Sequence, residues 1–394
     1  MLEIVFFLVL LLGLFFHKSK GVRYLLIFYI FGIMTLNSYN PDYRSYNLIY
    51  ANPNMADEEI GFRYLCKLGN ALNISYDVFH FIIVFVALVL FLRGVNKLCK
   101  FEKVIPSNFY LASYMLFPMM LDVVLLRSFL STCIIIYSLQ FLYRKKNWQY
   151  IIGVLCASSI HVSSMFFLSL LLFNIFENNL KEKKGISIRT IRFRLRSKNK
   201  RSKGDRKRYK WVRFWGIVAI VALFIGLKTQ FLQVFLTSLG LNAFKINLWL
   251  DGSNISFRMI ILCIILNLVN FMAYYFIRQI TLRGQYIDDI KNIDHLMYVT
   301  NYVLLINIIL MAYSEQFIRL LGVGIIINSI YYSIILKKER RQKQRWKIMT
   351  YGMIPAISLF LYRMFAYVTP DGTKYIEYVF KCVLENNFFV DILR

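Results

Sequence analysis

The sequence predicts an all-α polytopic membrane protein with about ten transmembrane helices. Hydrophobic residues make up 58% of the 394 residues and aromatic residues 17%, and the mean hydropathy is +0.53. A soluble domain with this composition would lack the polar residues to cover its surface. Apolar runs close to the length of about 20 residues that crosses hydrocarbon recur along the chain. Helices are the expected form, because a helix satisfies its own backbone groups in lipid.

The apolar runs are separated by connections rich in Lys and Arg. Candidate spans cover residues 2–16, 22–37, 78–92, 107–121, 124–143, 212–227, 259–277, 296–313, 317–336 and 348–368. Residues 1–394 are expected to form a single transmembrane domain. The basic connections should be cytoplasmic, which places the loop 38–77 on the outer side. Because the run 2–16 has no basic region before it and no small-residue cleavage site after it, we expect a first span rather than a removed signal.

The net charge is unusually positive and is concentrated in one connection. Lys and Arg number 48 against 21 Asp and Glu, which gives +27. Residues 181–210 contain fifteen basic and two acidic residues, so this stretch alone carries +13. A loop over 177–211 is therefore expected in the cytoplasm, facing anionic lipid. A nucleic-acid partner is not expected.

The apolar stretch 148–176 conflicts with this topology if it crosses the membrane once, because the basic loop would then lie outside. We predict a re-entrant hairpin of two short helices that turns near 158–164, with His161 at its apex. Non-helical backbone at membrane depth is tolerated where protein or a water-filled cavity surrounds it. His161 should then line a cavity, although a hydrogen-bonded core histidine is the ordinary alternative.

Three arginines stand at outer ends of predicted spans, where positive charge is disfavoured: Arg127, Arg258 and Arg319. A guanidinium presents a planar fork of donors that suits phosphate oxygens, so we interpret the three as candidate diphosphate ligands. Two have simpler alternatives. Arg319 follows Glu315 by four residues and can form a pair within one helix, and Arg258 can extend to the lipid headgroups.

The outer loop 38–77 combines carboxylates with tyrosines. Asp42, Tyr43, Tyr46 and Glu59 are candidate sugar-binding residues, because carboxylates accept hydrogen bonds from hydroxyls and tyrosine rings stack on sugar faces. Asp42 is also a candidate general base. An ordinary solvated loop with interfacial aromatic residues explains the same composition.

Sequence motifs for several other chemistries are absent. There is no P-loop, G-x-G-x-x-G, H-E-x-x-H or D-x-D motif, and the six cysteines form no C-x-x-C pair. We therefore expect no cofactor, no metal and no disulfide framework. The tail 370–394 is a possible interfacial helix.

Four short motifs occur in an order that resembles the EpsG-like and Wzy-like polysaccharide polymerases. They are Asp42 and Tyr46, then Glu59, Gly61 and Phe62, then Arg127 with the turn Arg144–Lys146, then Ala157, His161, Ser163 and Ser164. The order and spacing match over roughly residues 30–175. Ser128 departs from the pattern, since the arginine of this family is usually followed by Gln.

The resemblance implies a multi-pass enzyme of the bacterial inner membrane, similar to the C-type glycosyltransferases. It would join oligosaccharide repeat units carried on polyprenyl diphosphate into exopolysaccharide, capsule or O-antigen, by inverting, metal-independent glycosyl transfer at the outer face. Partners would be the bilayer, a flippase and a chain-length regulator. Either His161 or Asp42 would be the base. A glycan ligase, a flippase or transporter of lipid-linked sugar, and a non-catalytic scaffold remain alternatives.

Overall fold

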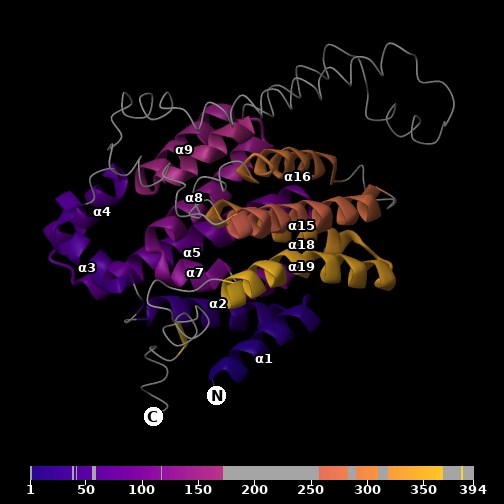
Figure 1. Ribbon diagram of the computed structural model, residues 1–394, viewed down its shortest axis with the longest axis horizontal. Helices are drawn as coiled ribbons and strands as arrows, with labels where there is room; N and C mark the ends of the chain where they lie inside the picture. Colours follow the sequence, from indigo (N-terminus) through magenta and orange to yellow (C-terminus); the bar gives the residue numbers. More distant parts are fainter. Residues whose placement is uncertain are drawn as a thin grey trace.

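The computed structural model describes residues 2–37, 40, 42–55, 59–116, 118–171, 257–282, 290–308, 318–366 and 383–384. Every regular element in these residues is a helix, which confirms the predicted all-α class (Figure 1). The N-terminal helices are α1 (Leu2–Phe15), α2 (Lys20–Thr35), α3 (Tyr43–Ala51), η1 (Pro53–Met55), α4 (Ile60–Ala71), α5 (Tyr76–Phe101), α6 (Phe109–Leu116), α7 (Pro118–Val124), α8 (Leu126–Tyr143), α9 (Asn147–Ile160) and η2 (Val162–Phe167). The later helices are α15 (Phe257–Leu282), α16 (Lys291–Leu304), α18 (Ile318–Lys338) and α19 (Gln342–Ala366).

Four of the described helices are long and apolar enough to cross a membrane: α5, α8, α18 and the part of α15 from Ile261 to Leu282. The count of about ten spans stays a prediction. The run expected at 107–121 contains the two helices α6 and α7, and α7 begins at Pro118, a residue that suits the first turn of a helix. The span predicted at 212–227 and the basic loop 177–211 lie outside the described residues, as does the tail 370–394 apart from residues 383–384.

Close packing at the centre joins α5 to α8 and surrounds α18. A Cβ added at Gly94 of α5 would lie 2.8 Å from the Cα of Tyr137, so this glycine permits α8 to approach at backbone distance. Of the most apolar stretch of α18, 94% is buried among α6, α15, α16 and α19. These contacts form one continuous core.

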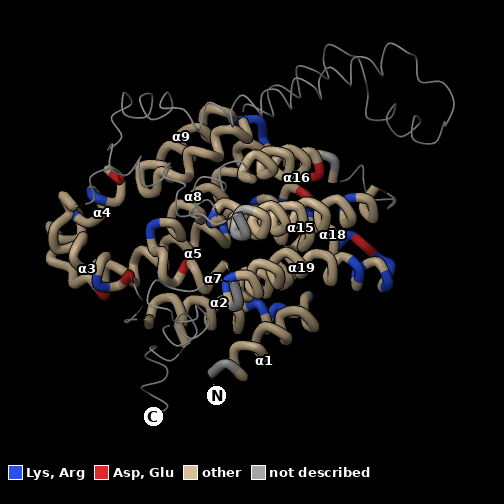
Figure 2. Tube along the Cα trace, in the orientation of Figure 1, with Lys and Arg blue, Asp and Glu red and all other residues tan. Residues whose placement is uncertain are grey.

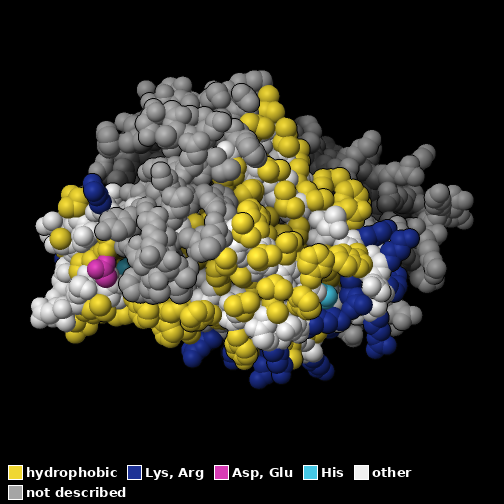
Figure 3. All heavy atoms as spheres, turned by 90° about the horizontal axis from the view of Figure 1, so that it is seen from below, with side chains coloured by type: hydrophobic (Ala, Val, Ile, Leu, Met, Phe, Trp, Pro, Cys, Tyr) yellow, Lys and Arg dark blue, Asp and Glu magenta, His cyan; other side chains and the backbone are white. Residues whose placement is uncertain are grey.

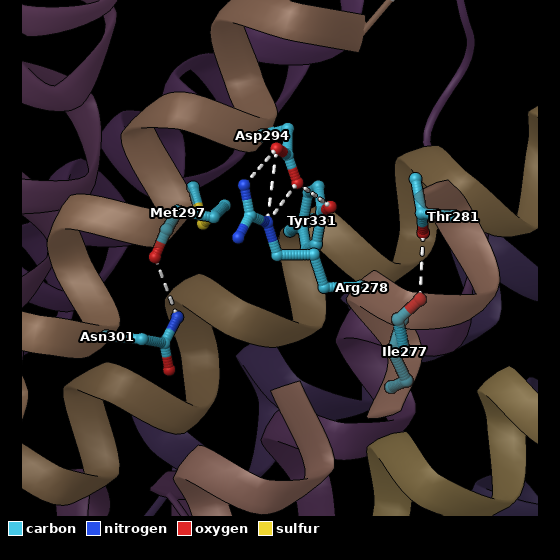
Figure 4. A network of polar contacts seen from close by, with 7 residues as sticks. All are labelled: Ile277, Arg278, Thr281, Asp294, Met297, Asn301 and Tyr331. Atoms are coloured by element: carbon cyan, nitrogen blue, oxygen red, sulfur yellow. Dashed lines mark hydrogen bonds and ion pairs between the residues drawn. The ribbon is translucent and has the colours of Figure 1, made fainter. Parts of the chain in front are cut away.

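Two buried polar networks tie α15, α16 and α18 together. Figure 4 shows Arg278 of α15 donating to Asp294 of α16, with Nη2 2.9 Å from Oδ2, while the Tyr331 hydroxyl of α18 donates to Oδ1 at 2.7 Å. Asn328 of α18 donates to Asn270 of α15 at 3.1 Å and to Asn301 of α16 at 2.9 Å. These bonds satisfy polar groups that would otherwise be costly to bury, and they fix how the three helices face one another.

The chain reverses where the sequence predicts a hairpin. Helix α9 ends at Ile160, His161 has extended backbone (φ −148°, ψ 112°), and η2 follows. The Tyr150 hydroxyl in the first half of α9 donates to the carbonyl of Phe167 at 2.8 Å, so η2 lies back along α9. Burial of this hairpin in a bilayer stays a prediction.

The segment expected as an outer loop, 38–77, contains the two helices α3 and α4. Their buried residues recur at helical spacing, with Tyr46 and Tyr50 on α3 and Phe62 and Cys66 on α4. In Figure 2 these helices lie at the left, and several Lys and Arg residues lie together at the right, at the ends of α18 and α19. Apolar side chains cover a broad part of the face in Figure 3, as expected for contact with lipid. That this basic end faces the cytoplasm remains a prediction from the charge pattern.

Candidate functional site

A single carboxylate connects three segments that are distant in sequence. Glu59 lies immediately before α4, Arg127 is the second residue of α8, and His161 is the residue that ends α9. The Arg127 guanidinium donates to Oε2 of Glu59. On the other side, Nδ1 of His161 is 2.8 Å from Oε1 of Glu59. We call Glu59, Arg127 and His161 the Glu59 cluster.

Two aromatic rings enclose the guanidinium of Arg127. Its central carbon is 5.2 Å from the ring centre of Tyr46 and 5.7 Å from that of Phe62. The rings meet edge to face with centres 6.0 Å apart, and both are buried. Such contacts attract a cation through the negative ring faces. The arginine is therefore held in one orientation by an ion pair and two rings.

Local sequence explains why the segments converge at this point. A Cβ added at Gly61 would lie 2.3 Å from the Ser159 hydroxyl oxygen and 3.0 Å from its carbonyl carbon, so only glycine allows α4 to approach the end of α9 this closely. The hydroxyls of Ser158 and Ser159 donate to carbonyls of their own helix, at 2.8 Å in each case. Serines that bond in this way weaken a helix interior, and α9 ends directly after them.

The cluster is largely buried but remains accessible. The side-chain exposure is 11% for Glu59, 17% for His161 and 29% for Arg127. Burial raises the pKa of Glu59, but the hydrogen bond to His161 and the charge of Arg127 outweigh it and hold the pKa below its usual value. Glu59 is therefore ionised near neutral pH and can only accept hydrogen bonds. It follows that Nδ1 of His161 carries the proton toward Glu59, which in the neutral imidazole leaves Nε2 with a free lone pair.

A second group of predicted residues lies beside the cluster. Asp42 precedes α3, and its pKa is raised by burial and partly restored by the charges of Arg319 and Arg127. Arg319, near the start of α18, lines a cavity of about 20 Å³ together with Asp122 and Ser128. This volume is sufficient for one water molecule. The charges of two arginines, one on α8 and one on α18, thus both favour the ionised form of Asp42.

Asp122 is a site residue that the sequence analysis did not single out. Its carboxylate is buried at the end of α7, faces the cavity of Arg319 and accepts a hydrogen bond from the Tyr114 hydroxyl at 2.9 Å. The sequence feature that could have found Asp122 is an acidic residue at the border of an apolar run, because such a residue in a membrane protein is usually functional or paired.

Two further residues predicted to contact ligand are Tyr43 and Arg258. Tyr43 donates its hydroxyl to Asp77, and its ring packs edge to face on Tyr76, so this tyrosine secures α3 to α5. Arg258 lies in the first turn of α15, but its side chain is outside the described part, as is Glu315, the alternative partner of Arg319. Within the described ranges, no group of three His, Cys, Asp or Glu residues could hold a metal ion.

Comparison with protein families gives one match. Residues 20–188 match the EpsG family. The resemblance predicted from the sequence is therefore confirmed over this segment. Together with the four apolar helices, the EpsG match indicates a membrane protein of the polysaccharide-polymerase type. No curated protein and no solved structure matches the chain.

The extent of the EpsG match agrees with the site. It begins at α2 and includes α3, α4, α8, α9 and η2, and so it covers every residue of the Glu59 cluster as well as Asp42 and Tyr46. Arg258 and Arg319 fall outside it. Similarity to the C-type glycosyltransferase fold stays a prediction.

Proposed function

We propose that this protein polymerises oligosaccharide repeat units carried on polyprenyl diphosphate, by inverting glycosyl transfer at the outer face of a bacterial inner membrane. The observation that carries the proposal is the Glu59 cluster. It joins a fixed cation to an oriented imidazole at the end of the molecule that the charge pattern assigns to the outside.

Each bond change in this reaction has a candidate group in the site. A hydroxyl of the acceptor sugar attacks the anomeric carbon of the donor, and the bond from that carbon to the diphosphate oxygen breaks. The hydroxyl proton passes to Nε2 of His161, the position left open by the Nδ1 bond to Glu59. The departing diphosphate takes the bonding electrons, and Arg127 and Arg319 stabilise its charge.

The geometry favours His161 over Asp42 as the base. Glu59 orients the imidazole and offsets the charge it gains, as the buried carboxylate does in catalytic triads. Asp42 is better suited to accept a sugar hydrogen bond beside Tyr46, near the guanidinium of Arg127. Both oxygens of Glu59 are engaged by protein groups. Its role in the proposal is therefore positioning rather than the sugar binding that the sequence suggested.

The test is a product ladder from purified protein in liposomes supplied with lipid-linked repeat units. Wild type should build polymer. His161→Ala should slow it by roughly 10²- to 10⁴-fold, and Arg127→Ala by roughly 10²- to 10³-fold. Arg44→Ala is the matched control, because Arg44 is an exposed residue of α3 near the same end of the molecule. This variant should keep the wild-type ladder.

Other outcomes identify the alternatives. A single transfer of glycan to a foreign acceptor, with no ladder, would indicate a ligase. Movement of labelled units between leaflets without a new glycosidic bond would indicate a transporter. Polymer formation that survives both His161→Ala and Arg127→Ala would place the chemistry elsewhere.

A further inference from the structure

A basic pocket lies at the opposite end of α8 from the Glu59 cluster. The turn Arg144–Lys146, which joins α8 to α9, and the first turns of α16 line an open pocket of about 490 Å³. Its lining includes Leu142, Arg144, Lys145, Lys146, His295 and Leu296. The volume lies within the range of about 300–1,000 Å³ typical of small-ligand sites. Among the described residues that line it, none is acidic.

This pocket is separate from the proposed diphosphate site. Arg127 and Arg144 are both in or at the end of α8, 17 residues apart, and a rise of 1.5 Å per residue separates them by about 25 Å. A ligand in the basic pocket therefore does not reach the Glu59 cluster. By the charge pattern it faces the cytoplasmic leaflet.

The turn has a lysine at a position where helix ends usually have glycine. Lys145 has φ 58°, and the amides of Lys145 and Lys146 bond to the carbonyls of Leu142 and Phe141, at 3.1 and 2.8 Å. This is the helix ending at which glycine is usual, because side chains disfavour the left-handed region. Lysine near a helix end also gains from the helix dipole. Lys103 ends α5 in the same way, with φ 57°, but is not among the residues that line the pocket.

An exposed tryptophan lies next to the pocket in the sequence. Trp148, two residues after Lys146, is 77% exposed, and exposed tryptophan is enriched at the membrane–water interface. Arg144 is fixed by stacking over the Phe101 ring at 4.1 Å. The adjoining Tyr143 hydroxyl donates to the buried Glu102 at 2.8 Å. These contacts hold the wall of the pocket in place before any ligand arrives.

We propose that this pocket binds the phosphate group of an anionic membrane lipid. Arg144, Lys145 and Lys146 contact the phosphate, and the buried side chains of Leu142 and Leu296 form the inner wall of the pocket. The same cations would accept free phosphate. The exposed Trp148 beside them favours the lipid as the source.

The experiment uses the full-length chain in phosphatidylcholine nanodiscs that contain increasing fractions of brominated phosphatidylglycerol, which quenches nearby tryptophan. The signal of Trp148 is the difference from Trp148→Phe. The test variant is Lys145→Gly combined with Lys146→Gln, because glycine suits φ 58° and the unfolding temperature in pure phosphatidylcholine should not fall. The matched control is Lys103→Gly, which makes at the end of α5 the same single change of charge and backbone as Lys145→Gly alone, and both single variants are measured beside the double variant.

In wild type, quenching should saturate at a low fraction of phosphatidylglycerol. The test variant should need at least about tenfold more, since each lysine near an anionic surface contributes to binding, and Lys103→Gly should behave as wild type. If instead inorganic phosphate raises the unfolding temperature of wild type but not of the test variant, and phosphatidylglycerol shows no preference, the site holds free phosphate. The proposal is overturned if Lys103→Gly weakens the quenching by phosphatidylglycerol as much as the test variant does. It is also overturned if wild type responds to neither phosphatidylglycerol nor inorganic phosphate.

Discussion

Substitution of Gly61 by alanine tests whether helix contact holds the Glu59 cluster together. The new Cβ would lie 3.0 Å from the carbonyl carbon of Ser159, whereas carbon atoms pack best about 3.5–4.0 Å apart. Because that atom belongs to the backbone, α4 must move from α9 by about 0.5–1 Å. Glu59 precedes Gly61 by two residues and His161 follows Ser159 by two. The shift therefore acts directly on the 2.8 Å bond between them.

The expected loss of reaction rate follows from the weakening of this hydrogen bond. A hydrogen bond to a charged group contributes about 1.5–3 kcal/mol, and it weakens once the separation exceeds about 3.2 Å. Transfer that depends on an oriented His161 should then slow by roughly 10- to 150-fold. The assay is the initial rate of polymer formation in liposomes, together with the unfolding temperature in detergent. Gly21→Ala is the control. The Cβ added there would have only Oγ of Ser19 within 4 Å, at 3.9 Å, which is an ordinary van der Waals contact.

A second substitution, which removes part of the steric clash, tests the same reasoning. Ser159→Gly removes the side-chain atoms that clash at 2.3 and 3.0 Å but leaves the carbonyl carbon. The double variant with Gly61→Ala should therefore recover only part of the lost rate. If Gly61→Ala folds and keeps its rate within about twofold of wild type, well short of the change expected for a lost charged hydrogen bond, the contact does not position His161 and the reasoning is refuted.

Three further outcomes are expected. Because the pKa of Glu59 lies below its ordinary value of 4.5, the ion pair of Glu59 stabilises the fold above about pH 4.5. This stabilisation is lost as the pH falls through the lowered pKa, so acid-unfolding curves of wild type and Glu59→Gln should converge at low pH. Burial raises the pKa of Asp42, so Asp42→Asn should leave the unfolding free energy at pH 7 unchanged or higher. If glycosyl transfer is lost in this variant but not in His161→Gln, Asp42 is the base. Asn328→Leu leaves two buried amides without their shared partner and should lower the unfolding free energy in detergent by about 2 kcal/mol.

The features that the sequence predicted best are those encoded locally. Apolar runs predicted helices, and the serines around His161 indicated where the turn that ends α9 would lie. The isolated charge of Arg127 in an apolar setting marked a site residue, because lipid and protein interiors reject such a group without a partner. These signals lie within one or two helical turns of sequence.

The arrangement of the site was not predictable in the same way. Glu59 is 68 residues from Arg127 and 102 from His161, and nothing in their spacing specifies that one carboxylate serves both. The sequence assigned Glu59 to sugar because its partners arrive from other helices. Tyr43 was grouped with Tyr46 by proximity, but residues three apart at the start of α3 reach different neighbours, Asp77 and Arg127. Only the packing of α3 and α4 onto α5, α8 and α9 separates these roles.

Charge balance explains why one carboxylate should face both an arginine and a histidine. In the proposed reaction His161 must start without a charge in order to accept a proton, and the cluster then has no net charge because Glu59 offsets Arg127. When His161 takes the acceptor proton, the cluster gains one positive charge at the step in which the departing diphosphate gains one negative charge. An ionised Glu59 makes that change easier, since it already accepts the bond from Nδ1 and needs no reorganisation. A site without Glu59 would meet the same step with two uncompensated cations side by side, which raises the cost of protonating His161.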